Sequence, residues 1–260
     1  MKIFKAITIF IVLVIPFIGL AQLDDLWMLD MLDETASLPS QEFYLDSLEL
    51  YWSADTYTPF GYRGKSLPVN GSIVTVEADL KLTKGNPSFL KYSWFLDGVF
   101  QEAKSGYGRT SFKFGVRRTP NLHHEVLVKV FNEDNSFYVE KSIIIPITSP
   151  EIVVFQNNGN SRINLKYNNI PNKYRVFADQ EVSFVALPFF FSINNIEDLE
   201  FEWSFANKQS KESSLTANLF GLKVVNKEEQ EPLSTELQVK ALNKKWYEQR
   251  IIKKLPVVVY

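Results

Sequence analysis

The amino-acid sequence predicts an all-β protein built from two consecutive β-sandwich domains that follow an N-terminal export segment. Three observations predict this architecture. Apolar and polar residues alternate with a period of two over most of the chain, the second half of the chain repeats the order of the first, and the 260 residues include no cysteine. Each sandwich must therefore be held together by packing alone, because no disulfide can form.

Strand-like segments begin after residue 44. Residues 73–78, 111–116 and 125–130 each place an apolar side chain at every second position, which is the pattern of a half-buried strand. Groups rich in Gly, Asn and Asp lie between such segments, and they favour turns because Gly and Asn tolerate positive φ. No sustained helical period follows residue 44, so the sequence favours strands joined by turns.

An internal repeat divides the chain into two units. The matching blocks lie in the same order at offsets of 108 to 111 residues, and a near-constant offset over several blocks indicates a duplication. We expect the first domain over residues 45–148 and the second over residues 149–260. The corresponding blocks are residues 71–78 and 179–186, Trp94 and Trp203, residues 124–132 and 235–243, and Pro146 and Pro256.

The repeated segments LKYSWFLDG (90–98) and LEFEWSFAN (199–207) each carry one tryptophan in an alternating strand. In a two-sheet sandwich such an indole fills the space between the sheets. The run YSWFLDG, followed by EVLVKVFNEDNSF, resembles the immunoglobulin-like and polycystic-kidney-disease-type (PKD-like) repeats of extracellular proteins. A second Gly-Asp pair, usual in PKD-like repeats, is missing after the Trp strand. The resemblance implies two immunoglobulin-like sandwiches, with Trp94 and Trp203 as structural core residues.

A second resemblance rests on the segment before residue 73. The run WSADTYTP (52–59), followed by Tyr62, the pairs Gly64-Lys65 and Leu67-Pro68, and Gly71-Ser72, is similar to uncharacterised exported proteins of ultrasmall bacteria of the Candidate Phyla Radiation. This resemblance implies a surface location and no assigned activity.

The N-terminal residues predict export. Residues 1–21 have a positive start at Lys2 and Lys5, an apolar run, and small residues before a cleavage site after Ala21, as in a signal peptide. The alternative is an uncleaved anchor, although about 16 apolar residues are short for a membrane span of about 20. Residues 22–44 form an acidic leader, either a short helix that ends before Pro39 or a linker.

An aromatic stretch at residues 51–64 is the best candidate for binding. Five aromatic side chains, two glycines and a proline lie within fourteen residues. Aromatic loops at the end of a sandwich can stack on sugar rings or grip a partner protein, because flat rings give contact area at low entropic cost. The alternative is that Trp52 and Tyr57 plug the open end of the first sandwich. The candidate binding residues are Trp52, Tyr57, Phe60, Tyr62 and Arg63.

Other residues argue against metal, nucleic-acid and catalytic functions. With 28 basic and 30 acidic residues the net charge is −2, so no basic field is present for nucleic acid. His123 and His124 are adjacent and point to opposite faces of a strand, so they cannot share a metal, and we expect a surface or loop-edge pair. Residues 132–135 offer oxygen atoms to Ca²⁺ but are also typical of a hairpin turn. No catalytic motif occurs, and we predict no enzyme activity, cofactor or metal.

The sequence thus predicts an exported, non-catalytic module for adhesion or structural interaction, located outside the cytoplasm as a secreted, periplasmic or cell-surface protein. Its partner would be a protein or a glycan, and it would contact the membrane only if residues 1–21 stay uncleaved. The alternative function is a carbohydrate-binding module that uses the aromatic stretch of the first domain.

Overall fold

The computed structural model describes residues 42–120, 122–157, 173–177, 179–206, 208–210, 217–224 and 232–260. The predicted signal peptide and all but the last three residues of the predicted leader lie outside these ranges. Residues Glu42–Tyr260 form one compact unit. Within the described ranges, no helix is both long and apolar enough to cross a membrane.

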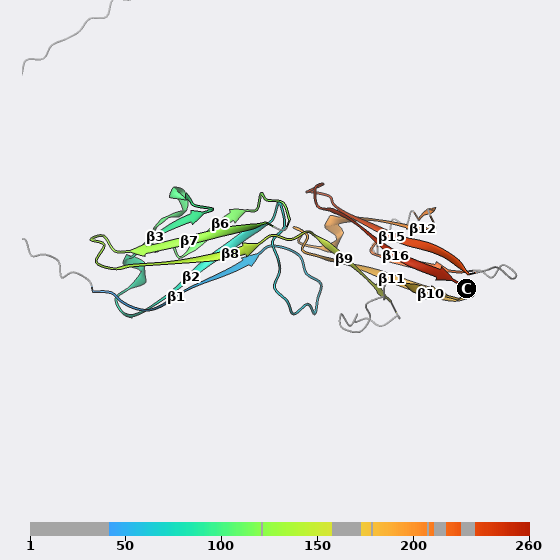
Figure 1. The fold of residues 1–260 in the computed structure, drawn as a ribbon, viewed down its shortest axis with the longest axis horizontal. Coiled ribbons are helices and arrows are strands. Elements are labelled where there is room, and N and C mark those ends of the chain that lie inside the picture. Colours follow the sequence, from blue (N-terminus) through green and yellow to red (C-terminus); the bar gives the residue numbers. More distant parts are fainter. Residues whose placement is uncertain are drawn as a thin grey trace, which may run out of the picture. The chain divides into compact units, whose positions relative to one another are not determined.

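The first sandwich pairs a three-stranded sheet with a five-stranded sheet, and Figure 1 traces both. All of its strand pairs are antiparallel. The smaller sheet has the order β1-β2-β6, formed by β1 (Tyr44–Ala54), β2 (Ile73–Lys84) and β6 (Ser111–Gly115). The larger sheet has the order β4-β3-β7-β8, and β5 also pairs with β3; its strands are β3 (Lys91–Leu96), β4 (Val99–Phe100), β5 (Gly106–Tyr107), β7 (His123–Phe131) and β8 (Tyr138–Pro146).

The second sandwich has the same division into three and five strands. The smaller sheet has the order β14-β11-β9, formed by β9 (Glu151–Gln156), β11 (Glu181–Phe189) and β14 (Leu219–Lys223). The larger sheet has the order β10-β16-β15-β12-β13, in which β10 runs parallel to β16. Its strands are β10 (Tyr174–Val176), β12 (Leu199–Phe205), β13 (Lys208–Ser210), β15 (Leu233–Asn243) and β16 (Arg250–Val259).

Each sandwich encloses its own hydrophobic core. In β2 and β7 the buried side chains fall at every second position, because successive residues of a strand point to opposite faces of the sheet. The first core includes Val74, Val76, Tyr92, Val126 and Val128, which are all fully buried. The second includes Ile152, Phe184, Phe191, Leu237 and Val239. The predicted all-β class, with two consecutive immunoglobulin-like sandwiches, is confirmed.

One tryptophan lies at the centre of each core. Trp94 on β3 is fully buried and stacks on Phe112 of the opposite sheet, with 5.6 Å between the ring centroids. Trp203 on β12 stacks on Phe220 at 5.3 Å. Each indole N–H donates to a backbone carbonyl, that of Arg109 at 2.8 Å in the first core and that of Ala217 at 3.0 Å in the second. The indole thus fills the space between the sheets without leaving its polar atom unpaired.

Both tryptophan strands have the same flanking turns. A single 3₁₀ turn precedes each strand, η2 (Pro87–Phe89) before β3 and η4 (Ile196–Asp198) before β12. A residue in the left-handed conformation follows each strand, Asp97 with φ 50° and Ala206 with φ 49°. The first unit has one further 3₁₀ turn, η3 (Glu102–Lys104). These shared turns extend the sequence repeat into backbone geometry, while the exact domain limits at residues 148 and 149 stay a prediction.

Replacing Trp94 by alanine should lower the free energy of unfolding by about 3–5 kcal/mol, because the large side chain leaves a cavity and the Arg109 carbonyl loses its donor. Urea-induced unfolding followed by circular dichroism measures the change. Trp203→Ala should have a similar effect, whereas Tyr51→Ala, which removes an exposed ring from β1, should change stability by less than about 0.5 kcal/mol. A Trp94→Ala protein as stable as the wild type would contradict the packing role.

Candidate functional site

The segment that joins β1 to β2, residues 55–72, carries most of the predicted binding residues and is called the β1–β2 connection below. It is long for a loop in a compact domain, and connections of this length are usually functional. Its two ends are tied together, because the Ile73 N–H donates to the Asp55 carboxylate at 2.6 Å and the Asp55 N–H donates to the Ile73 carbonyl at 3.0 Å. The connection therefore leaves and re-enters the smaller sheet at one point.

Two tyrosines of the β1–β2 connection pack against the second sandwich. Tyr57 forms an isolated antiparallel bridge with Phe191, and both backbone hydrogen bonds around it, to Phe190 and Phe191, are 2.7 Å long. The Tyr62 ring meets the rings of Phe189 and Phe190 edge-on, at centroid distances of 5.5 and 6.0 Å. Burial raises the pKa of Tyr57, and the nearby charge of Glu197 raises it further. Both rings are therefore largely engaged within the chain.

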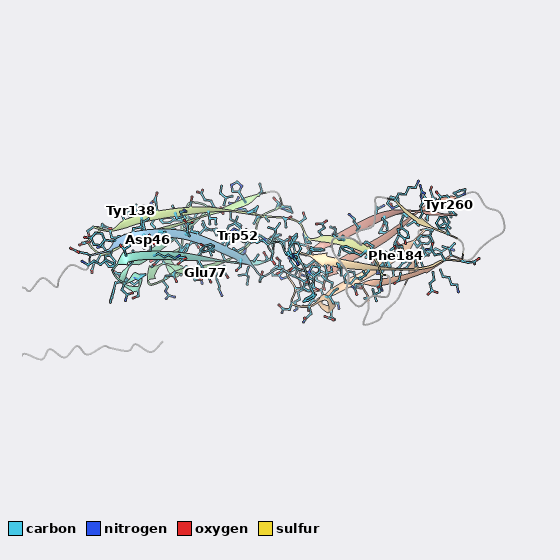
Figure 2. The ribbon with its side chains drawn as sticks, turned by 90° about the horizontal axis from the view of Figure 1, so that it is seen from below. Asp46, Trp52, Glu77, Tyr138, Phe184 and Tyr260 are labelled. Atoms are coloured by element: carbon cyan, nitrogen blue, oxygen red, sulfur yellow. The ribbon has the colours of Figure 1, made fainter. Side chains whose placement is uncertain are left out.

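Trp52 lies at the end of β1 and is labelled in Figure 2. Its half-buried ring packs against the first core. The Lys65 ammonium lies 3.5 Å from the centre of this ring, a cation–π contact, and burial lowers the pKa of Lys65. The Trp52 ring thus contacts both the first core and the Lys65 ammonium, and its roles in binding and in plugging the sandwich both stay predictions.

Phe60 and Arg63 are the members of the predicted set that point into solvent. Phe60 is 93% exposed, the largest value among the exposed large hydrophobic side chains of the described residues, and Arg63 is also exposed. Gly61 follows Phe60 with φ +88°, a conformation that favours glycine. The Tyr62 N–H donates to the Pro59 carbonyl at 3.1 Å and closes the turn around Phe60. The turn therefore presents one ring and one guanidinium outward.

The turn between β15 and β16 contacts the β1–β2 connection from the second sandwich. Asn243 and Gln249 are almost fully buried, and the Asn243 amide donates to Gln249 at 2.9 Å and to the Ser192 carbonyl at 3.1 Å. Gln249 accepts the Ser192 N–H at 2.9 Å and donates to the Asn70 carbonyl at 2.8 Å. Asn70 also donates to Glu248 at 2.9 Å. Because these amides are buried and bonded, they fix the turn against the connection.

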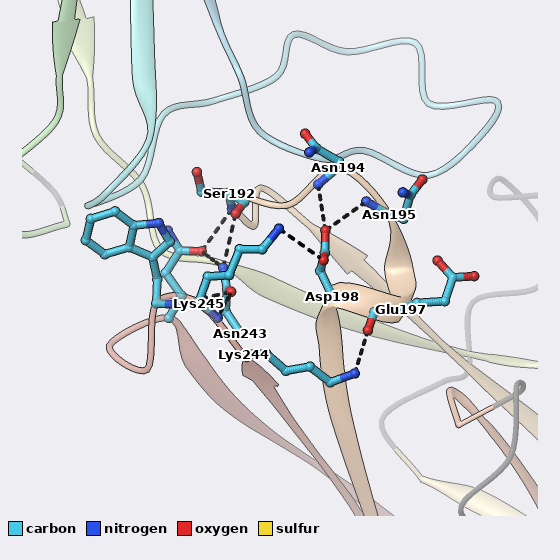
Figure 3. Close-up of polar contacts among 10 residues, drawn as sticks. Ser192, Asn194, Asn195, Glu197, Asp198, Asn243, Lys244 and Lys245 are labelled. Atoms are coloured by element: carbon cyan, nitrogen blue, oxygen red, sulfur yellow. Dashed lines mark hydrogen bonds and ion pairs between the residues drawn. The ribbon is translucent and has the colours of Figure 1, made fainter.

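Figure 3 shows a second set of polar contacts beside this network, around Asp198 at the end of η4. The Asp198 carboxylate accepts the backbone N–H groups of Asn194 at 3.2 Å and Asn195 at 3.3 Å, and it pairs with the Lys245 ammonium at 3.3 Å. The two backbone hydrogen bonds, followed by Lys245, lower the pKa of Asp198. The carboxylate is fully used in holding the chain before β12, so it is not a free acid or base.

Asp97, Arg118 and His124 form a charged cluster that has no counterpart among the described residues of the second sandwich, where Ala206 takes the place of Asp97. The Asp97 carboxylate lies 2.6 Å from the Arg118 guanidinium and 2.7 Å from His124 Nδ1, and it accepts the Glu125 N–H at 3.0 Å. Burial raises the pKa of Asp97, but these three partners outweigh burial and hold it below its usual value. The cluster fixes the turn after β3.

The two histidines differ from the surface pair that the sequence predicted. His123 is exposed, but His124 is only 5% exposed. His124 lies on the inner face of β7, the face that also carries the buried Val126. Its ring meets Phe114 edge-on, and Nε2 has no hydrogen-bond partner among the described residues. Nδ1 lies 2.7 Å from an Asp97 carboxylate oxygen, and the Arg118 Nε–H donates to it at 3.2 Å. His124 is therefore a buried residue at the edge of the first hydrophobic core.

Two side chains of the candidate calcium turn, Asn132 and Asp134, use oxygen atoms within the turn. Asn132 Oδ1 accepts the Phe137 N–H at 2.9 Å, and Asp134 Oδ1 accepts the Ser136 N–H at 2.9 Å. Asn135 has φ 58°, as expected for Asn in a tight turn. Among the described residues, no group of three His, Cys, Asp or Glu side chains is arranged to hold a metal ion. The geometry is that of a hairpin turn.

Two hollows of the described surface lack converging carboxylates. One open hollow of about 290 Å³ is lined by Ile196, Glu197, Leu199, Phe201, Ala217, Asn218 and Lys244, and Glu197 is its one carboxylate. Another is lined by Lys240, Arg250, Ile251 and Ile252, with no acid. A pair of carboxylates would be needed for glycoside hydrolysis, and neither hollow supplies one.

Sequence reasoning missed the buried amides of the second sandwich. Asn132 and Asn243 end the matching segments KVFN and KALN, so the repeat itself marked this position as one with a common role. In both units the asparagine is buried and bonds the turn that follows, to Phe137 and Ser136 in the first and to Lys245 and Trp246 in the second. The partner Gln249 had no such signal, because its bonds depend on tertiary contacts.

No family model matches the chain, and no curated protein matches it. Solved structures with a similar fold include three N-terminal domains of the Highly Immunogenic Outer Capsid protein of bacteriophage RB49, at 14% identity and a TM-score of 0.47, covering 84% of this chain and 59% of that one. This chain therefore spans less than two thirds of that structure.

Two further structures are similar at lower scores. The glucan-utilisation protein SGBP-B of Bacteroides ovatus, solved with a mixed-linkage heptasaccharide, has 8% identity and a TM-score of 0.24 over 83% of this chain and 70% of that one. The central fibronectin-III array of RIM-binding protein has 9% identity and a TM-score of 0.25, over 85% and 68%. The fold defines the chain as an all-β tandem of immunoglobulin-like sandwiches, and these similarities carry no argument about its function.

Replacing Gln249 by alanine should lower the free energy of unfolding by about 1–3 kcal/mol, because the partly buried Ser192 N–H and Asn70 carbonyl lose their partner. Urea titration of the purified chain measures this. The control is Tyr247→Ala in the same turn, where the ring is 70% exposed and the expected change is within about 0.5 kcal/mol. Equal stability of the two variants would show that the network contributes nothing.

Replacing Asp97 by asparagine tests the charged cluster while retaining a residue that tolerates the left-handed conformation. The folded pKa of Asp97 lies below its unfolded value of about 3.9, so the carboxylate stabilises the fold above that pH and the contribution is lost as pH falls through the folded pKa. We expect Asp97→Asn to cost about 1–3 kcal/mol at neutral pH and less in acid. Unfolding titrations at both pH values check this, and an unchanged difference would contradict it.

Proposed function

We propose that the chain is an exported, non-catalytic interaction module, adhesive or structural in role, that binds a protein outside the cytoplasm through Phe60 and Arg63. The observation that carries the proposal is the 93% exposure of Phe60 at the turn of an anchored loop. A large aromatic side chain left in water gains no burial energy from folding. Its placement at such a turn is therefore explained by contact with a partner.

The anchoring of the loop strengthens this argument. Tyr57 and Tyr62 hold the β1–β2 connection against Phe189, Phe190 and Phe191, so the turn with Phe60 is supported on both sides. A loop that is fixed before binding loses less conformational entropy when a partner arrives. Aromatic and arginine side chains are the residue types that most often dominate the energy of protein interfaces. The combination of Phe60 and Arg63 suits this role.

A carbohydrate-binding module remains the alternative function. Sugar recognition commonly uses several aromatic faces, and the packing of Trp52, Tyr57 and Tyr62 within the chain leaves Phe60 as the freely exposed ring of the predicted set. This arrangement favours a protein partner over a glycan. The predicted set of five residues stays a prediction.

The proposal also includes export of the chain from the cytoplasm. We infer that residues 1–21 act as a signal peptide, that residues 45–148 and 149–260 are the two domains, and that the protein works as a secreted, periplasmic or cell-surface component. The PKD-like character of the repeats and the likeness to exported proteins of the Candidate Phyla Radiation belong to the same proposal. The absence of cysteine is compatible with this location, because packing replaces disulfides in both cores.

The test compares the exported wild-type chain with the double variant Phe60→Ala and Arg63→Ala. Immobilised wild type should capture a partner from a cell-surface fraction, and the double variant should bind that partner at least about thirtyfold more weakly, as expected when interface hot spots are removed. Tyr51→Ala is the matched control, since it removes a 58% exposed ring from the neighbouring strand. Affinity is measured by biolayer interferometry with the captured partner.

A glycan array probed with the same proteins separates the alternatives. Binding to the array that disappears in the double variant would replace the protein proposal by the carbohydrate one. Capture that is equal for wild type and double variant would show that the β1–β2 connection is not the binding surface.

A further inference from the structure

A small hydrophobic cluster joins the two sandwiches, and we call it the junction cluster. It is separate from the two cores. Its buried members are Val69 of the β1–β2 connection, which is fully buried, and Phe189 and Phe190 of the second sandwich. Both sandwiches therefore contribute apolar surface to one contact. The partly buried side chains around these three are Tyr62 and Leu67 of the connection and Val153 and Leu187 of the second sandwich.

The first sandwich holds the β1–β2 connection at its base. Ser72 is fully buried, and its hydroxyl donates to the Val69 carbonyl at 2.8 Å and accepts the Val69 N–H at 3.1 Å. The Gly71 N–H donates to the Val116 carbonyl at 3.0 Å, and the Val116 N–H donates to the Ser72 carbonyl at 2.8 Å. Val69 is thus fixed beside the end of β6, so this part of the connection belongs to the first sandwich.

The same connection holds the covalent link between the sandwiches. Residues 147–150 lie between the end of β8 and the start of β9. Within this link the Thr148 N–H donates to the Pro68 carbonyl at 2.9 Å, and Thr148 forms an isolated parallel bridge with Val69. Ile147 is buried in the first core. A short link with these contacts leaves the sandwiches little freedom to turn while the connection is in place.

The second sandwich also contacts the connection near its end. Gln249 donates to the Asn70 carbonyl at 2.8 Å, and the Trp246 ring lies so close to Gly71 that a β-carbon there would come within 3.3 Å of it. The two tyrosines of the connection make the other contacts with the second sandwich. A rotation of one sandwich against the other would break several of these contacts together.

Phe190 has a strained backbone among these contacts. Its φ is 61°, in the left-handed region that a bulky residue seldom adopts. Its N–H donates to the Tyr57 carbonyl at 2.7 Å, and its ring meets the Tyr62 ring edge-on at 6.0 Å. Strained conformations persist only where their surroundings hold them, and they are common in switch regions. Two of the contacts that hold Phe190 come from the first sandwich.

We propose that the β1–β2 connection is a latch with two states. In the closed state it holds the two sandwiches in one orientation and keeps Phe190 left-handed. In the open state it leaves the junction cluster, Phe190 relaxes to an ordinary conformation, and the sandwiches turn about residues 147–150. Relaxation of Phe190 offsets part of the free energy that is lost with the cluster, so strain and opening are coupled. Phe60 and Arg63 are not members of the junction cluster, so the latch does not depend on the proposed function.

A distance measurement between two nitroxide labels on the full chain, by pulsed electron paramagnetic resonance, tests the latch. The chain has no cysteine, so Lys113→Cys on β6 and Lys253→Cys on β16, both at exposed positions, supply the label sites. The labelled wild type should give one narrow distance distribution. With Tyr62→Ala and Leu67→Ala added, the distribution should become about twofold broader or more, because domains joined by a small interface move relative to one another.

The controls separate opening of the latch from loss of folding. Tyr62 and Leu67 pack on the junction cluster and are members of neither core, so both sandwiches should stay folded, which circular dichroism and thermal unfolding check. Tyr62→Ala alone should broaden the distribution less, and it replaces the double variant if that variant is unfolded. Phe60→Ala is the matched control, because it removes a 93% exposed ring from the same connection and should leave the distribution unchanged.

Two replacements of Phe190 test the strain. Phe190→Ala and Phe190→Gly both remove the ring, but glycine adopts the left-handed conformation without a steric penalty. Both are compared in the Tyr62→Ala chain, in which the latch is weakened. The ratio of closed to open distances should be about fivefold higher with glycine than with alanine. At a position with an ordinary backbone alanine would be the better residue, because glycine loses more conformational entropy on folding.

Three outcomes would overturn the proposal. The first is a wild-type distribution as broad as that of the Tyr62→Ala and Leu67→Ala variant. The second is a folded double variant, or a folded Tyr62→Ala chain in its place, with a distribution as narrow as that of the wild type. The third is a closed population with alanine at position 190 that equals or exceeds the population with glycine.

Discussion

The stacking of one indole on one phenyl ring between two sheets is the contact on which the rest of this structure depends. Without cysteine the sheets of each sandwich are held by packing, and Trp94 on Phe112 and Trp203 on Phe220 occupy the centre of the space between them. The indole N–H is satisfied by a backbone carbonyl in both cases, so the largest side chain of the core is buried without an unpaired polar atom. Strand order, register and turns follow around this contact.

Comparison of the two repeated units distinguishes the features that the fold requires from the features that only one unit has. The tryptophan, the 3₁₀ turn before its strand, the left-handed residue after it and the buried asparagine occur in both units, which marks them as parts of the scaffold. Among the described residues, the charged cluster at Asp97 belongs to the first unit alone. The residues shared by both units account for stability. The residues that differ between the units are the candidates for interaction with other molecules.

The aromatic residues of the β1–β2 connection have different surroundings, because some pack inside the chain and Phe60 faces solvent. Backbone pairing of Tyr57 with Phe191 and ring contacts of Tyr62 use most of its apolar surface inside the chain, and Gln249 and Asn70 add polar contacts from the second sandwich. The same anchoring leaves Phe60 in solvent at a supported turn. Composition alone treats these aromatic residues as equivalent, although their surroundings give them different roles.

The sequence by itself determined the all-β class, the two-unit repeat and the central tryptophan positions, because a period of two and a constant offset follow directly from local pattern. It could not determine which residues of the aromatic stretch face solvent or that His124 is buried beside Asp97. Those features depend on strand register and on contacts between residues far apart in the chain. Only the tertiary structure decided them, because the environment of a side chain is set by neighbours that local sequence does not specify.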